Sequence, residues 1–126
     1  MTQNIKGMLL EVRFAEDDPK SNFKEALNRW RANSDQQKRL IARMYVQLQQ
    51  LADTRQLRSP DKWNKEGILP NGKHYYAVKM QKIRAYGWYS TRHAGVFYIS
   101  HFAFKRGEKL HKDDHNRVIG NWNKIE

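Results

Sequence analysis

The chain has 126 residues, no cysteine, and 24 basic against 13 acidic side chains, a formal net charge of 24 − 13 = +11. This length suits one thin-cored domain over residues 1–126, and the charge predicts a polyanionic partner. The composition excludes disulfides, thiolate chemistry and cysteine-ligated zinc, and no apolar run approaches the roughly 20 residues that cross a bilayer, so we expect a cytoplasmic protein with no membrane partner.

The first half of the chain predicts a strand followed by two helices. In residues 8–14 (MLLEVRF) apolar and charged side chains alternate, which is typical of a half-buried strand. Asp18 followed by Pro19 predicts the start of an amphipathic helix. Ser34, with Gln37 three residues later, predicts a capping box for a second and longer helix. Because the connection between them is short, the two helices should form an antiparallel hairpin.

The second half predicts a meander of strands and a final helix. Residues 55–73 contain two turn signals and no sustained period, so we expect an irregular connection there. Aromatic and β-branched runs at residues 75–80, 83–90 and 95–104 predict three antiparallel strands. Residues 113–124 predict a last helix, although an internal glycine weakens it.

Together these elements predict an α+β fold with the order β-α-α-β-β-β-α. A small antiparallel sheet would carry the helix hairpin on one face and leave its other face open to solvent. Residues 1–70 carry 13 bases and 9 acids (+4), whereas residues 71–126 carry 11 bases and 4 acids (+7) and all five histidines. The open face and the second half of the chain are therefore the expected place for polyanion binding and for imidazole chemistry near neutral pH.

Three basic and aromatic motifs follow one another in the second half. A strand segment that ends in an arginine, Lys82-Ile83-Arg84, is followed by a loop and by the apolar strand Val96-Phe97-Tyr98, and Phe104-Lys105-Arg106 and Lys109 come after it. In this pattern residues 78–126 resemble the RelE/HigB toxin superfamily, particularly its phage-associated members. The predicted order of the preceding strand and helix hairpin is also that of the family, so the resemblance implies a RelE-like fold.

The resemblance implies a toxin that cleaves messenger RNA, usually on the ribosome, without metal or any other cofactor, and that a cognate antitoxin neutralises. Metal-free RNA cleavage needs a group that deprotonates a 2′-hydroxyl, cations that stabilise the phosphorane, and a group that neutralises the leaving oxygen. Lysine, arginine, histidine and tyrosine can divide these tasks. Residues 67–107 contain no carboxylate, so two-metal phosphodiester chemistry is not expected in this stretch.

The predicted site follows from these motifs. The catalytic candidates are Arg84, His101 and Lys105. The RNA-binding candidates are Lys82, Arg92, His93, Arg106, Lys109 and His111. No metal site is predicted, because His111 and His115 share a helical spacing but have no third ligand except Asp114.

Each candidate also has a structural interpretation. Lys82 and Arg84, two apart on one predicted strand, could form a solvated polar face. His101 shares its predicted strand face with the apolar Phe97 and Ile99, so it could be a hydrogen-bonded core histidine.

One position departs from the family pattern, and two other functions stay open. Many family members have an arginine immediately before the apolar-apolar-tyrosine strand, where this chain has Gly95, and Arg92 is the nearest substitute. The alternatives to an RNA-cleaving toxin are a non-catalytic gyrase poison of the ParE type and a basic nucleic-acid-binding module.

Overall fold

The structure is a computed structural model that describes residues 4–105, 107 and 110–126. Its elements are β1 (Ile5–Lys6), β2 (Glu11–Phe14), α1 (Pro19–Arg29), α2 (Ser34–Thr54), β3 (Trp63–Ile68), β4 (His74–Met80), β5 (Ile83–Tyr89), β6 (Val96–Phe104) and α3 (Lys112–Ile125). The fold is α+β, as the sequence predicts. The sheet within these residues is larger than predicted, with six strands in the order β1-β2-β6-β5-β4-β3. It is also mixed, because β2 runs parallel to β6 while the other neighbouring pairs are antiparallel.

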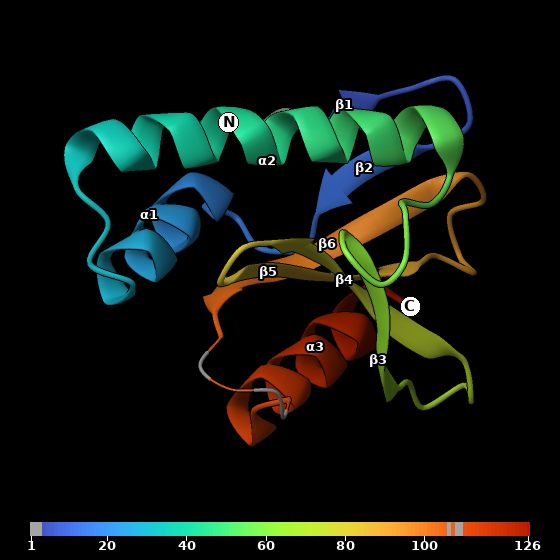
Figure 1. Cartoon of the computed structure of the whole chain (residues 1–126). Helices are drawn as coiled ribbons and strands as arrows, with labels where there is room; N and C mark the ends of the chain where they lie inside the picture. The colour runs from blue at the N-terminus through green and yellow to red at the C-terminus, as the bar shows by residue number, and fades with distance from the viewer. Residues whose placement is uncertain (1–3, 106, 108–109) are drawn as a thin grey trace.

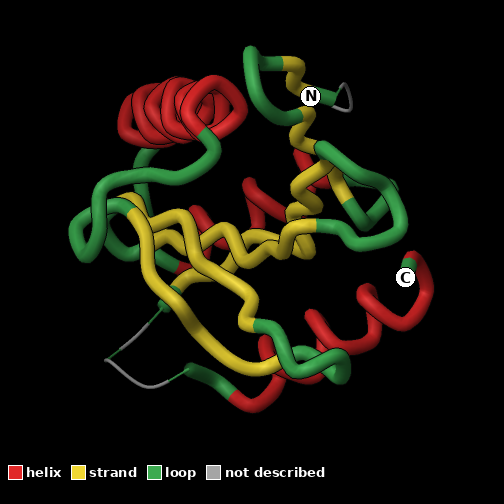
Figure 2. Tube along the Cα trace, turned by 90° about the vertical axis from the view of Figure 1, so that its right-hand side faces the viewer, coloured by secondary structure: helices red, strands yellow, loops and turns green. Residues whose placement is uncertain are grey.

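The sheet lies between two helical layers (Figure 1 and Figure 2). α1 and α2 cover one face as the predicted hairpin, and they enclose the larger hydrophobic core with residues such as Phe23, Met44 and Phe97. α3 covers the opposite face and encloses a second core that includes Trp88 and Val118. The expectation of an open sheet face is therefore wrong. None of the described helices is both long and apolar enough to cross a membrane.

The sequence does not predict the two strands at the edges of the sheet. β1 has only two residues, and the strand predicted over residues 8–14 begins at Glu11, with Met8 87% exposed in the turn before it. β3 lies inside the predicted irregular connection. Its register against β4 shifts between Lys65 and Ile68, which breaks the period of two that a strand normally shows.

Local hydrogen bonds fix both helix starts. The Asp18 carboxylate accepts from the backbone N–H of Ser21, as predicted for the start of α1. The capping box of α2 lies one residue earlier than predicted, between Asn33 and Gln36. Asparagine caps a helix as well as serine does, so the sequence allows either start. Gln37 instead donates to the carbonyl of residue 32 and the side chain of residue 28, which ties the hairpin together.

A bulge in β6 decides which side chains face α3. His101 pairs with Tyr86, whereas Ile99 pairs with Gly87, so Ser100 is an extra residue. Ile99 packs in the core under the helix hairpin, while Ser100 and His101 both bond to side chains of α3. The prediction that His101 shares a face with Ile99 is wrong, because the bulge interrupts the alternation.

Gly87 opposite the bulge provides a test of this register. A Cβ atom at this position would clash with the carbonyl oxygen of Tyr98, so Gly87→Ala should lower the free energy of unfolding by about 2 kcal/mol or more. Gly120→Ala is the matched control, because this α3 position has open space around it and alanine favours a helix by about 1 kcal/mol. Urea denaturation followed by circular dichroism measures both changes, and a Gly87→Ala protein as stable as the wild type would contradict the bulge.

Candidate functional site

The first turn of α3 crosses the three central strands and meets a polar group from each. Asp114 Oδ1 lies 2.9 Å from His101 Nε2 on β6, and His115 Nδ1 lies 2.8 Å from the Tyr75 hydroxyl on β4. Tyr86 of β5 lies between these pairs, with its ring centroid 5.5 Å from that of His101 and 6.3 Å from that of Tyr75. We call these five residues the polar layer. It brings a carboxylate, two imidazoles and two phenols together under one helix end.

The hydroxyl of Tyr86 is buried in the polar layer and has no hydrogen-bond partner among the described residues. Burial raises the pKa of this hydroxyl, and the negative charges of Asp114 and Glu66 raise it further, so the group keeps its proton. An unpaired buried hydroxyl destabilises a fold by about 1–3 kcal/mol. Such a group calls for an explanation, and a bound ligand that accepts the hydrogen bond is one.

Arg84 lies two residues before Tyr86 on the same face of β5. Its Nη1 atom donates to the carbonyls of Gln81 at 2.6 Å and Ile83 at 3.1 Å, while its buried Nε atom has no partner in the described structure. Burial lowers the pKa of this guanidinium, and the nearby Tyr86 and Glu66 act in the opposite direction. No described carboxylate lies within ion-pair distance, so the backbone holds this cation in place and leaves its charge available.

Further lysines surround Arg84. Lys79 is directly opposite it on β4, and Ala103 is opposite it on β6, with Lys105 two residues farther along. The backbone N–H of Lys105 donates to the carbonyl of Lys82 at 2.8 Å, which brings the β4–β5 turn alongside. Like charges directly opposite one another destabilise a sheet, and the Lys79 ammonium instead donates to the carbonyl of Pro60 at 2.9 Å. We call Lys79, Lys82, Arg84 and Lys105 the basic cluster.

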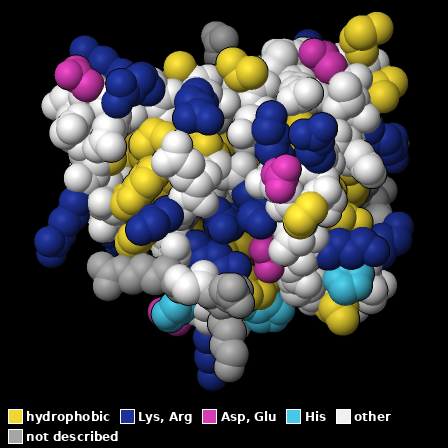
Figure 3. Space-filling view, in the orientation of Figure 1, with side chains coloured by type: hydrophobic (Ala, Val, Ile, Leu, Met, Phe, Trp, Pro, Cys, Tyr) yellow, Lys and Arg dark blue, Asp and Glu magenta, His cyan; other side chains and the backbone are white. Residues whose placement is uncertain are grey.

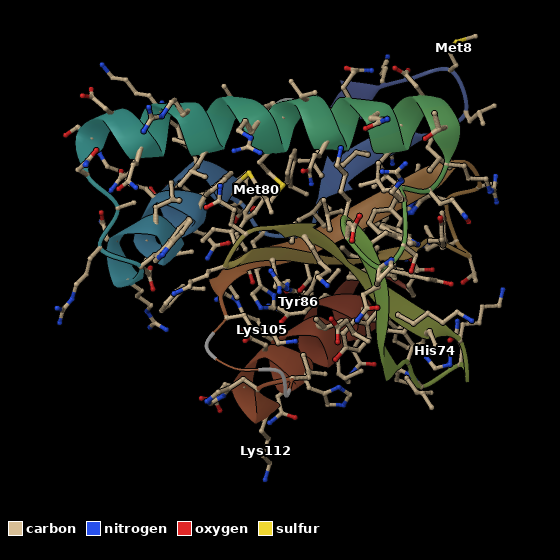
Figure 4. The ribbon with its side chains drawn as sticks, in the orientation of Figure 1. Met8, His74, Met80, Tyr86, Lys105 and Lys112 are labelled. Carbon is tan, nitrogen blue, oxygen red and sulfur yellow. The ribbon has the colours of Figure 1, made fainter. Side chains whose placement is uncertain are left out.

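A cleft of about 600 Å³ joins the basic cluster to the polar layer. It is lined by Arg29, Arg31, Phe104, Lys105, His111, Asp113 and Asp114. Its volume lies within the range of about 300–1,000 Å³ that ligand sites occupy. Lys and Arg side chains gather at the centre of this face in Figure 3, and Figure 4 labels Tyr86 and Lys105 between the strands and α3. A ligand in the cleft would therefore contact Lys105 and Asp114 directly.

His101 orients Asp114 from beneath the cleft. Its side chain is fully buried, with Nδ1 2.8 Å from Ser100 Oγ and Nε2 bonded to Asp114. Asn121 of α3 donates to the same Ser100 oxygen. The position of His101 is thus that of a hydrogen-bonded core histidine, the structural alternative left open by the sequence, and its influence on a ligand runs through Asp114.

A partly buried carboxylate anchors the rest of α3. Glu16, just after β2, accepts from Arg117 and from Asn121. Burial raises the pKa of Glu16, but the hydrogen bonds from Arg117 and Asn121 outweigh that effect and hold the pKa below its ordinary value. α3 is therefore fixed both to the sheet and to the loop that precedes α1.

The predicted site residues separate into two groups. Lys105 and His111 line the cleft, whereas Arg84 and Lys82 do not. Lys82 occupies the β4–β5 turn, where its carbonyl accepts from the Lys105 N–H, and it does not share a strand face with Arg84. Arg106 and Lys109 lie outside the described residues. Sequence reasoning missed the roles of Tyr86 and Asp114, because only the covering of the sheet by α3 reveals them.

Arg92 and His93 lie at the other end of β5, a seven-residue strand that spans about 20 Å. Arg92 Nη1 donates to the carbonyl of Ile125 at 3.1 Å, and His93 Nδ1 lies 3.1 Å from the Tyr98 hydroxyl. The structure does not bring these two residues to the cleft. Arg92 therefore does not replace the family arginine at Gly95 in the arrangement seen here.

Comparisons with known proteins do not add to this description. A scan against protein-family models, a search of curated proteins and a search of solved structures each gave no match. Within residues 4–105, 107 and 110–126, no group of three or more His, Cys, Asp or Glu side chains is placed to hold a metal ion.

The carboxylate of Glu126 ties the end of α3 to the β5–β6 turn. It accepts hydrogen bonds from the Trp88 indole, the Ser90 hydroxyl, and the backbone N–H groups of Thr91 and Arg92. Burial raises the pKa of Glu126, but these hydrogen bonds outweigh it and lower the pKa to about 2. The ionised carboxylate thus stabilises the fold.

Glu126→Gln should lower the free energy of unfolding at pH 7 by about 1–2 kcal/mol, because it removes charge-assisted hydrogen bonds. Since the folded pKa is lowered, this stabilisation is present above the unfolded value near 4.5 and disappears as the pH falls toward 2. The difference between the two proteins should therefore shrink over this range in urea denaturation curves. Asp61→Asn removes an exposed charge as a control, and a difference that stays constant with pH would contradict the role of Glu126.

Proposed function

We propose that this chain is a metal-independent endoribonuclease of the RelE/HigB kind, the toxin of a toxin–antitoxin pair that cleaves messenger RNA at the cleft. One observation carries the proposal: the buried, unpaired Tyr86 hydroxyl lies near enough to Arg84 and Asp114 for both charges to act on it, and Asp114 lines a cleft together with Lys105. The ribosome and a cognate antitoxin as partners, and a cytoplasmic location, rest on the sequence alone.

The order of elements supports the RelE-like part of the proposal. The observed order is β1-β2-α1-α2-β3-β4-β5-β6-α3, which gives the expected succession β-α-α-β-β-β-α when the edge strands β1 and β3 are left out. β1 and β3 are additions at the two edges of the sheet. The cleft lies against the end of β6, where Phe104 and Lys105 of the motifs that carry the resemblance line it.

The side chains around the cleft can supply each part of RNA cleavage. The 2′-oxygen attacks the adjacent phosphorus and the bond from phosphorus to the 5′-oxygen breaks, which leaves a 2′,3′-cyclic phosphate and a 5′-hydroxyl. Arg84 and Lys105 stabilise the charge that builds on the phosphorane, and Tyr86 donates a hydrogen bond to a non-bridging oxygen. Asp114 accepts the proton of the 2′-hydroxyl, and His115 delivers a proton to the 5′-oxygen.

Removing a cation from the cleft should remove cleavage. We expect Lys105→Gln and Arg84→Gln each to slow RNA cleavage about 100-fold or more, the usual effect of losing one group that stabilises transition-state charge. Lys112→Gln, at the exposed start of α3, is the matched control and should cleave normally. Purified protein is incubated with labelled messenger RNA, with and without ribosomes, and new 5′ ends are mapped.

Inducible expression separates this function from its rivals. Growth arrest with cut messages that disappears in both cleft variants supports the nuclease. Arrest that persists in both variants contradicts the proposed site. Intact messages with damaged DNA would indicate a ParE-type gyrase poison, and the absence of any arrest a nucleic-acid-binding module.

Tyr86→Phe distinguishes a functional hydroxyl from a structural one. Because the hydroxyl is buried without a partner, its removal should leave the free energy of unfolding unchanged or raise it by about 1 kcal/mol, while RNA cleavage falls at least tenfold. Tyr45→Phe removes another unpaired buried hydroxyl, on α2, and should leave cleavage unchanged. Thermal unfolding and cleavage rates measure the two effects, and full activity in Tyr86→Phe would refute the role of this hydroxyl.

A further inference from the structure

A second pocket lies where the helix hairpin meets the β4–β5 turn. Its volume is about 190 Å³, and it is lined by Trp30, Gln36, Arg39, Leu40, Arg43 and Gln81. The lining contains an indole and two guanidinium groups and no carboxylate. We call it the Trp30 pocket. In Figure 3 hydrophobic side chains are exposed between basic ones on the part of the face where α1 meets α2.

The charges in this pocket have no evident structural purpose. Arg39 and Arg43 are one helical turn apart on α2, both are exposed, and neither has an ion-pair partner among the described carboxylates. Like charges at this spacing destabilise a helix. Trp30 caps the end of α1 with its side chain partly exposed beside them. An aromatic ring flanked by arginines is a surface on which a flat, negatively charged ligand can stack.

The Trp30 pocket and the cleft share no lining residue, but neighbouring residues connect them. The carbonyl of Gln81, which lines the pocket, accepts the 2.6 Å hydrogen bond from Arg84. Arg29 and Arg31, the neighbours of Trp30 in sequence, line the cleft. A polyanion that enters the cleft therefore finds a basic path from Lys105 along the β4–β5 turn to α2.

We propose that the Trp30 pocket binds one unpaired base of the single-stranded RNA that is cleaved in the cleft, an inference that rests on the proposed function. The pocket is smaller than the roughly 300–1,000 Å³ of a site for a drug-sized ligand, so it suits a single base and not a base pair. Stacking on Trp30 is independent of sequence, because every base has a π face, and Arg39 and Arg43 bind the neighbouring phosphates.

Binding of an uncleavable RNA tests the pocket separately from the chemistry. The probe is a fluorescein-labelled 2′-O-methyl oligoadenylate of about 10 nucleotides, within the usual site size of single-strand binders. The double variant Arg39→Gln/Arg43→Gln should bind it about tenfold more weakly by fluorescence anisotropy, with the slope of log affinity against log salt reduced by about 1.4 for two lost phosphate contacts. Lys24→Gln/Lys38→Gln removes two exposed charges from the same helices outside the pocket and should change affinity by less than about threefold.

Stacking is measured by placing the fluorescent base 2-aminopurine in the same oligonucleotide. Its fluorescence should be quenched on binding to the wild type and to Trp30→Phe, which keeps a ring, and much less on binding to Trp30→Leu. A duplex of the same length should bind more weakly than the single strand, because its bases are already stacked with one another.

The outcomes separate the pocket from the nuclease. If the wild type cleaves RNA while the arginine double variant binds the probe as tightly as the wild type, the pocket proposal fails and the proposed function stands. Equal losses of affinity in the two double variants, or tighter binding of the duplex than of the single strand, also overturn the pocket proposal. If the wild type neither binds the probe nor cleaves RNA, both proposals fail.

Discussion

The hydrogen bond between His101 and Asp114 is the contact on which the candidate site depends. It exists because the extra residue at Ser100 turns His101 toward α3. In an unbroken strand His101 would face the core under the helix hairpin, where an imidazole without a partner would be unfavourable. Once Asp114 is held, the helix geometry directs His115 toward Tyr75 on the next strand but one, and the polar layer is complete.

The cleft gathers features that a fold selected for stability alone would avoid. The Tyr86 hydroxyl and the Arg84 Nε are buried without partners among the described residues, and Lys79 lies directly opposite Arg84 on the neighbouring strand. Unpaired buried groups of this kind destabilise a fold by about 1–3 kcal/mol each, against a total stability of about 5–15 kcal/mol for a domain. Two layers of core, one on each face of the sheet, offset this destabilisation. Departures from local rules that gather at one place are typical of functional sites.

The sequence predicts the parts of the structure that depend on neighbouring residues and misses the parts that depend on residues far away in the chain. The starts of α1 and α2 and the three strands of the meander depend on neighbouring residues, so caps and alternation find them to within a residue or two. β1 and β3 are edge strands that are short or bulged, and their partners rather than their own pattern define them. The sequence predicts three members of the basic cluster, Lys82, Arg84 and Lys105, and misses Lys79. It also misses Tyr86 and Asp114, because their significance depends on α3 lying over the sheet.

The parallel pairing of β2 with β6 also governs how the molecule can assemble. Glu11 pairs with Val96, a separation of 96 − 11 = 85 residues, and β2 separates the β1 edge from the rest of the sheet. The helix hairpin and the β4–β5–β6 meander contain mostly local contacts and can form early, whereas the closure of a long loop makes the β2–β6 contact slow. During synthesis on the ribosome, β6 and α3 emerge after the helix hairpin and the first strands. A newly made chain therefore acquires its cleft only after both elements have left the ribosome.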